Sequence, residues 1–213
     1  MSRPHSGAGG PAPLPPSARD AARAELDAAL AARGGRELTV VTLSVPASGP
    51  RALWDEASDA LLWAAPDEPA QAGLGTALLL EGDLHAVRDA AQRAFARLTH
   101  RGAADLGPAP RLTGGFAFDR GAAREPIWAG FGAGAFVLPR WSAGEGWLRF
   151  AVDGPAETAV ALRELDVVLD RLAHGAALPP APSLVSRTDE PRARWDRRVE
   201  DIVRAIEAGA ATK

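Results

Sequence analysis

The sequence predicts an α+β protein in which a mainly antiparallel sheet is backed by helices. Segments rich in β-branched and other apolar residues come in runs, and the connections within each run are short. Short connections favour antiparallel pairing, because a parallel pair needs a long crossover. Single segments with apolar residues at helical spacing separate these runs, so each helix can pack one face on the sheet.

The first half of the chain contributes a tail, two helices and three strands. Residues 1–16 are rich in Pro, Gly and Ala and are expected to be a disordered tail. Ser17 can cap a helix over residues 18–32, and Asp83 can cap another that runs to about residue 98. The strands between these helices are predicted at residues 37–45, 60–65 and 73–80.

The second half contributes three strands and two helices. Pro155 opens a helix over residues 155–173, and the last helix begins near Asp189 or Glu190 and ends at Gly209. Three strands precede these helices, at residues 111–118, 131–138 and 147–152. The last helix carries an apolar stripe opposite a charged face, made of Trp195, Val199, Ile202, Val203 and Ile206.

Composition excludes several functional classes. A hydrophobic content of 46% with 24% charged residues is ordinary for a soluble protein. The net charge of −3 gives no reason to expect nucleic acid or an anionic membrane as a partner. No apolar run approaches the ~20 residues that a membrane span needs, and the first residues lack the apolar core of a signal peptide. The absence of cysteine excludes disulfides and thiolate chemistry and suits a cytoplasmic enzyme.

The basic residues are lopsided, since Lys213 is the only lysine among 24 lysine and arginine residues. GC-rich coding bias explains the excess of arginine. A site that needs a neutral amine cannot accept arginine, whereas a desolvated lysine can act as a base. On position alone, however, a C-terminal lysine is normally exposed and inert.

Other candidate motifs favour structural interpretations. The Gly-rich stretch at residues 130–134 leads into an apolar run, not a helix, so we expect close backbone approach within a sheet and no dinucleotide site. The histidines share no metal-ligand spacing and are expected at the surface; they are His5, His85, His100 and His174.

Two polar residues near predicted strand ends are weaker candidates. Asp119 could anchor a ligand near a cleft, but a turn acceptor or a partner for Arg120 or Arg140 is favoured. Arg140 could recognise a carboxylate, although a lone arginine at a strand end is usually at the surface. The nearby aromatic residues are expected in the sheet core; they are Trp128, Phe131, Phe136 and Trp141.

Three motifs and the last helix carry a family resemblance. GGFAFD begins at Gly114, W-x-x-F-G begins at Trp128, and FVLPR ends at Arg140. The last helix has the form W-x-x-x-V-x-x-I-x-x-x-I-x-x-G and leads to Lys213. Together these motifs resemble the amino-terminal part of isochorismate synthases, which are chorismate-utilising enzymes. Anthranilate- and aminodeoxychorismate-type members tend to carry a tyrosine near the first motif, and this chain has no tyrosine.

The resemblance implies a fold, a substrate and a mechanism. The chain would form an incomplete half of the chorismate-utilising fold, with an amino-terminal α+β subdomain at residues 17–185 and the start of the catalytic domain at residues 186–213. Lys213 would be the general base that activates a water for attack on C2 of chorismate. A glutamate would protonate the leaving C4 hydroxyl, and glutamates would hold Mg²⁺. In family members those groups lie beyond the position of Lys213, so the chain is expected to be an amino-terminal fragment that is inactive alone.

Two alternatives remain open from sequence. The chain could belong to a chorismate-utilising enzyme with another product, namely salicylate, anthranilate or aminodeoxychorismate. It could also be a non-catalytic α+β domain for assembly or small-molecule binding. For an isochorismate synthase the resemblance implies supply of menaquinone or siderophores. The sequence does not fix the oligomeric state.

Overall fold

The computed structural model describes residues 14–35, 37–47, 49–54, 59–64, 68–117, 132–174 and 191–210. The chain divides into two compact units, residues 1–176 and 177–213. In the described part, the first unit consists of one β-sheet packed against α-helices. The described part of the second unit contains a single helix, α4 (Arg192–Glu207). The predicted α+β class with a mainly antiparallel sheet is confirmed.

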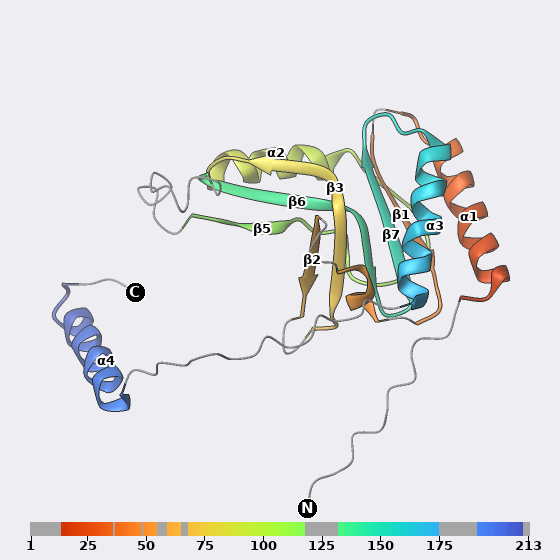
Figure 1. Cartoon of the computed structure of the whole chain (residues 1–213). Helices are drawn as coiled ribbons and strands as arrows, with labels where there is room; N and C mark the ends of the chain where they lie inside the picture. The colour runs from red at the N-terminus through yellow and green to blue at the C-terminus, as the bar shows by residue number, and fades with distance from the viewer. Residues whose placement is uncertain are drawn as a thin grey trace, which may run out of the picture. The chain divides into compact units, whose positions relative to one another are not determined.

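Seven strands of the described part form one sheet (Figure 1). The main path runs in the order β2-β3-β6-β7-β1-β4, and β5 pairs with β6 beside that path. All pairs are antiparallel except β1 with β4, which are parallel. The strands are β1 (Leu38–Ser44), β2 (Ala60–Trp63), β3 (Gln71–Glu81), β4 (Leu98–Gly102), β5 (Thr113–Phe116), β6 (Gly134–Gly144) and β7 (Trp147–Asp153).

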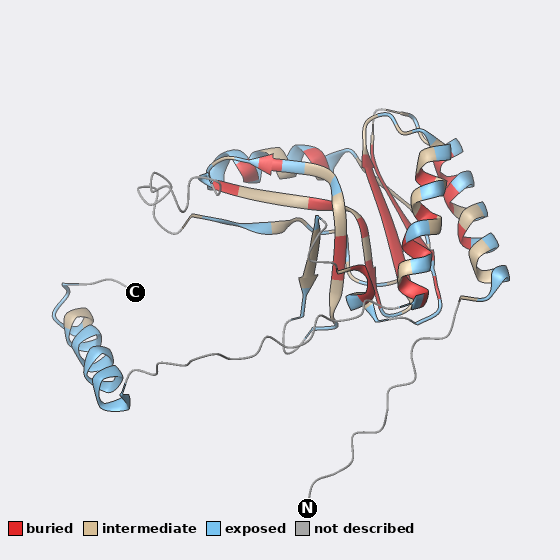
Figure 2. Cartoon of the chain, viewed as in Figure 1, coloured by how far each residue is buried: buried red, intermediate tan, exposed pale blue. Residues whose placement is uncertain are grey.

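The central strands β1 and β7 are buried on both faces, as the red ribbons in Figure 2 show. Successive side chains of a strand point to opposite faces of the sheet. Val41 and Leu43 of β1 therefore enter the core under the helices α1 (Pro16–Ala31) and α3 (Thr158–His174). Leu38 and Val40 enter a smaller core on the other face.

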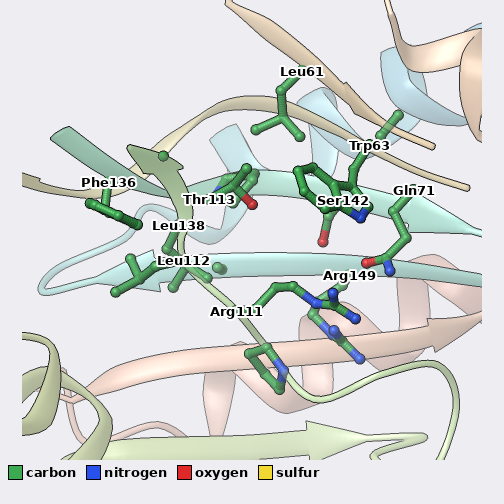
Figure 3. A pocket seen from close by; sticks show the side chains of 15 residues that line it. Leu61, Trp63, Gln71, Arg111, Leu112, Thr113, Phe136, Leu138, Ser142 and Arg149 are labelled. Carbon is green, nitrogen blue, oxygen red and sulfur yellow. The ribbon is translucent and has the colours of Figure 1, made fainter. Parts of the chain in front are cut away.

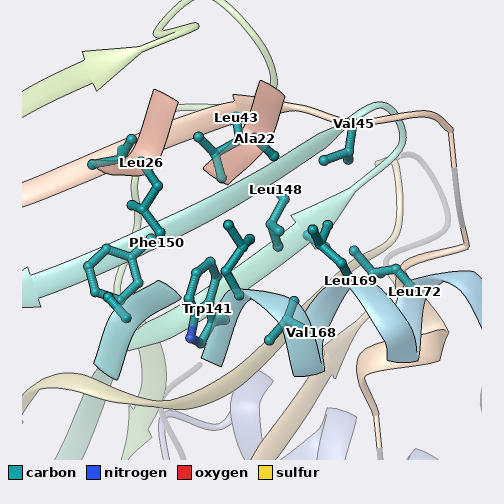
Figure 4. Close-up of a cluster of buried hydrophobic side chains, with 14 of the residues drawn as sticks. Ala22, Leu26, Leu43, Val45, Trp141, Leu148, Phe150, Val168, Leu169 and Leu172 are labelled. Carbon is teal, nitrogen blue, oxygen red and sulfur yellow. The ribbon is translucent and has the colours of Figure 1, made fainter. Parts of the chain in front are cut away.

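The larger core joins α1 and α3 to the sheet. Phe150 of β7 is fully buried there, with its ring centroid 4.8 Å from that of Trp141 on β6 (Figure 4). Leu26 of α1 and Leu165 of α3 are also fully buried in it. Arg23 of α1 forms an ion pair with Asp166 of α3. The predicted helical faces thus pack as their spacing indicates.

Helix α2 (Leu84–Ala96) covers part of the opposite face, where Ala94 packs with Leu38 and Val40. The predicted cap at Asp83 is confirmed, because its carboxylate accepts a hydrogen bond from the Ala86 backbone N–H at 2.9 Å. The predicted cap at Ser17 is wrong, because α1 already begins at Pro16 and no side chain caps it. The larger core therefore lies under two helices, α1 and α3. Among the described helices, the smaller core lies under α2 alone, and α2 covers only part of that face of the sheet.

Strand β3 bends sharply in the middle, as the yellow arrow in Figure 1 shows. Thr76 pairs with Pro139 and Leu78 pairs with Leu138, so Ala77 is an extra residue and forms a β-bulge. Gly75, with φ of 63°, supplies the left-handed backbone just before it. A proline cannot donate to the sheet, and the irregular pairing opposite Pro139 accommodates it.

The structure also corrects the predictions for the end of β6, for the residues after α2 and for His100. The strand expected to end at residue 138 continues through Pro139 to Gly144, because the bulge in β3 tolerates the missing N–H. The sequence predicts that the helix runs to about residue 98 and that the residues after it lie at the surface, but residues 98–102 form the strand β4. His100 therefore lies within a strand, half-buried, and not at the surface after a helix. Parallel pairing with the buried strand β1 selects this conformation.

Candidate functional site

The predicted catalytic residue Lys213 lies outside the described residues, as do Asp119, Trp128 and Phe131. The helix that precedes Lys213 in the sequence is described, and α4 forms as its motif predicts. Its apolar stripe is exposed in the second unit: Trp195 keeps 59% of its surface and Ile202 also keeps 59%. No residue of α4 is buried.

Arg140 binds a carboxylate of its own chain. Its Nε donates to Glu164 Oε2 of α3 at 2.7 Å, and the Trp141 indole N–H donates to the same oxygen at 3.1 Å. The Arg140 guanidinium also lies 4.9 Å from the centroid of the Phe150 ring. Arg140 therefore connects β6 to α3 through an ion pair with Glu164, and this contact stabilises the fold.

The described aromatic candidates have different environments. Trp141 is 2% exposed and belongs to the larger core, which confirms its predicted role. Phe136 is half-buried and stacks at a tilt on Phe116, with ring centroids 4.8 Å apart. Phe136 also lines a pocket on the face of the sheet away from α1 and α3.

This pocket encloses about 240 Å³ between β2, β3, β5, β6, β7 and the segment that precedes β5 (Figure 3). Arg111, Arg149, Gln71 and Ser142 lie toward one end together with the Trp63 ring, whereas Leu112, Phe136 and Leu138 lie toward the other end near Thr113. The polar groups that line it are Gln71, Arg111, Thr113, Ser142 and Arg149, and the larger apolar groups are Leu61, Trp63, Leu112, Phe136 and Leu138.

Arg149 is the unusual member of this pocket, because it is 4% exposed and sits in the otherwise apolar strand β7. Its Nε donates to Thr42 Oγ1 at 2.9 Å, and its Nη2 donates to the Leu106 carbonyl at 3.2 Å. Its guanidinium also lies 4.7 Å from the centroid of the Trp147 ring. These contacts fix the side chain, and each of these hydrogen-bond acceptors is neutral.

His100 extends the same hydrogen-bonded chain. Its Nε2 lies 2.7 Å from Thr42 Oγ1. Burial and the positive charge of Arg149 lower the pKa of His100 below its usual value, so the ring is neutral near pH 7. The Thr42 hydroxyl can then accept from Arg149 and donate to the His100 ring, so the donors and acceptors of these two hydrogen bonds match.

Positive charge accumulates at the polar end of the pocket. Burial and the charge of Arg111 lower the pKa of Arg149 to about 10. Arg111 Nη1 donates to Glu68 Oε2 at 3.1 Å, and both of these side chains are close to half exposed. Two guanidinium groups therefore lie at this end, Glu68 pairs with Arg111 alone, and the described lining of the pocket contains no acidic residue.

The described residues do not offer a metal site. No group of three or more His, Asp and Glu side chains comes together among them in a way that could hold a metal ion. The magnesium ion implied by the resemblance therefore does not fit any cluster in this part of the chain. Within the described residues, no helix combines the length and apolar character that crossing a membrane requires.

Sequence reasoning missed the pocket residues Gln71, Arg111, Ser142 and Arg149. One signal was present, because Arg149 interrupts the apolar run WLRFAV of β7 at a position that faces the protein interior. A buried arginine needs acceptors and often marks a polar site. Its partners come from β1 and from the segment after β4, and strand pairing brings them together.

The fold and the pocket define an α+β protein with a small pocket, lined by two arginines, on one face of its sheet. A protein-family model described as "Chorismate binding enzyme" matches residues 26–213. The match covers most of both compact units, and the chain belongs to this family of chorismate-binding enzymes. A search of curated proteins gives no match.

Proposed function

We propose that this protein acts as an isochorismate synthase, which isomerises chorismate to isochorismate. Family membership supports chorismate as the small-molecule substrate. The observation that carries the proposal is the family match extending to residue 213 through a helix with the motif residues Trp195, Val199, Ile202 and Ile206. The GGFAFD motif without tyrosine favours isochorismate over anthranilate or aminodeoxychorismate as the product.

In the proposed reaction Lys213 acts as the general base. Its neutral amine takes a proton from water, and the water oxygen bonds to C2 of chorismate. The ring double bond shifts, and the C4 hydroxyl leaves as water after it takes a proton from an acid on the opposite side. Water is added and lost once each, so the net reaction is an isomerisation.

Lysine can serve as this base only if its pKa is lowered. The unperturbed pKa of lysine is ~10.4, so a neutral amine near pH 7 requires desolvation or a neighbouring positive charge. Arginine at this position would stay protonated. Mg²⁺ remains part of the proposal by resemblance alone; when bound, it would neutralise the substrate carboxylate, and the mechanism assigned to Lys213 does not depend on it.

The test measures chorismate turnover by the natural protein that contains residues 1–213. We expect isochorismate as the product, and we expect Lys213→Ala to lower kcat by about 10²–10⁴-fold, the usual contribution of acid–base catalysis. Lys213→Arg is the matched control for charge and should be equally impaired. Added primary amines should restore part of the activity of Lys213→Ala, because they supply the missing base.

Three outcomes would contradict the proposal. Salicylate, anthranilate or aminodeoxychorismate as the main product would assign the protein to another reaction of the family. Full activity of Lys213→Ala or Lys213→Arg would remove the role of the lysine as base. A folded protein that does not convert chorismate, with Mg²⁺ supplied, would favour a non-catalytic binding or assembly domain.

A further inference from the structure

We propose that the pocket lined by Arg111 and Arg149 binds a small organic carboxylate with an apolar or aromatic body. This inference is independent of the proposed catalytic role of Lys213, because every residue that carries it belongs to the first compact unit. The ligand would place its carboxylate at the arginine end and its body among Leu112, Phe136 and Leu138.

Arg149 is a buried cation, because only 4% of its surface is accessible to solvent. Taking a guanidinium out of water is costly unless a charge compensates for it. Its guanidinium donates hydrogen bonds to the Thr42 hydroxyl and the Leu106 carbonyl, and neither acceptor carries a negative charge. An anion in the pocket would supply the missing compensation.

The charged groups around Arg149 do not balance one another. Arg111 lies close enough to lower the pKa of Arg149, so the two cations repel each other in the free pocket. Glu68 offsets only one of them, and from a half-exposed position at the rim. Since His100 is neutral near pH 7, the cluster of Arg111, Arg149, Glu68 and His100 carries one uncompensated positive charge.

The shape and chemistry of the pocket lining also fit an organic carboxylate. Planar guanidinium groups recognise carboxylates through paired hydrogen bonds. Ser142 and Gln71 flank the arginines in Figure 3 and can donate further hydrogen bonds. The opposite end is apolar, and a volume of about 240 Å³ is smaller than the pockets that hold drug-sized ligands. This combination fits a single-ring carboxylate better than an inorganic anion, which would leave the apolar end unused.

The hydrogen bonds that hold Arg149 have a further consequence. Thr42 and Leu106 restrain the side chain before any ligand arrives, and the Trp147 ring covers its face. A restrained arginine loses less conformational entropy on binding than a free one. Arg111 is more exposed and can adjust, so Arg149 would orient the carboxylate and Arg111 would close over it.

The test titrates the 213-residue chain with benzoate and with benzamide, and follows backbone amide signals by NMR. Benzamide has the same ring and nearly the same shape but carries no charge. We expect benzoate to shift the signals of Thr113, Ser142 and Ala151, which line the pocket. Benzamide should bind at least about tenfold more weakly, because hydrogen bonds between a guanidinium and a charged carboxylate are stronger than those to a neutral amide.

Two variants assign the binding to the pocket. Arg111→Gln removes the half-exposed guanidinium without disturbing the buried one, and it should weaken benzoate binding about tenfold. Arg88→Gln is the matched control, because Arg88 is an exposed arginine of α2 outside the pocket lining, and its removal changes the net charge equally. Arg149→Gln is not used alone, since loss of its internal hydrogen bonds could unfold the protein.

The proposal fails if benzoate shifts no pocket signals at millimolar concentration in the folded wild-type chain. It also fails if benzamide binds as tightly as benzoate, or if Arg111→Gln and Arg88→Gln weaken binding equally. None of these results bears on the conversion of chorismate, so the two proposals can fail separately.

Discussion

The two faces of the sheet are built from the same strands but differ in the chemistry of their buried side chains. On the face under α1 and α3, Val41, Leu43, Leu148 and Phe150 are at or near zero exposure and form a continuous apolar core. On the other face, β1 and β7 carry Thr42 and Arg149 at positions that are equally buried. One face therefore stabilises the fold, whereas the other has polar groups that stability alone does not require.

The difference shows where to look for function in a small α+β unit. Replacing a buried charged network by apolar residues is often neutral or stabilising in proteins. A buried arginine held by neutral acceptors thus lowers stability relative to an apolar side chain, and a role in ligand binding explains its presence. The comparison predicts that substitutions on the first face change stability most, and substitutions on the second face change binding and pH dependence.

The largest expected effect on stability is at Phe150. Phe150→Ala should lower the free energy of unfolding by about 3–5 kcal/mol, because it removes a fully buried ring and leaves a cavity beside Trp141. Phe136→Ala on the other face is the matched control, and it should cost roughly 1–2 kcal/mol because that ring is half-buried. Urea unfolding measures both. Equal losses would show that the two faces contribute alike.

The elements of the first face could be predicted from the sequence because their signals are local. The run LTVVTLS identifies β1, and the helical spacing of Leu165, Val168, Leu169 and Leu172 identifies the buried side of α3. Helix α2 lies on the second face, but its start could also be predicted, because the capping residue Asp83 directly precedes it in the sequence. Each of these signals lies within a few residues of the element that it specifies.

The second face could not be predicted in the same way, because its features depend on contacts between distant segments. β4 is short and polar in sequence and becomes a strand by pairing with β1. The path of β6 through Pro139 depends on the bulge at Ala77, about 60 residues earlier in the chain. The arginine pocket joins side chains from five strands and from the segment that precedes β5. Sequence motifs pointed instead to Lys213, which the described residues do not include.

A smaller effect is expected at Gly114, in the GGFAFD motif. A Cβ atom at Gly114 would lie 2.0 Å from the Ala135 carbonyl oxygen of β6, so Gly114→Ala must push β5 away from its neighbour. We expect a loss of about 1–3 kcal/mol in unfolding free energy. Gly115→Ala meets open space and should change stability by less than about 0.5 kcal/mol. Urea unfolding of both variants tests this, and equal losses would contradict the close approach.

The smallest expected effect is a pH dependence at His100. Its pKa is lowered in the folded protein by burial and by Arg149, so the unfolded chain binds a proton at a higher pH than the folded one. Stability should therefore fall as the pH drops from about 6.5 toward the lower folded pKa, because the unfolded state gains the proton first. At higher pH both states are neutral and this contribution is constant.

His100→Gln should flatten the stability profile in that pH window, because glutamine can accept the hydrogen bond of Thr42 without titrating. His85→Gln, at an exposed position in α2, is the matched control and should leave the profile unchanged. Thermal unfolding between pH 5 and pH 8 measures the effect for each variant. An unchanged slope in His100→Gln would mean that the proton is taken up elsewhere, and that His100 is not coupled to the buried charge of Arg149 on this face.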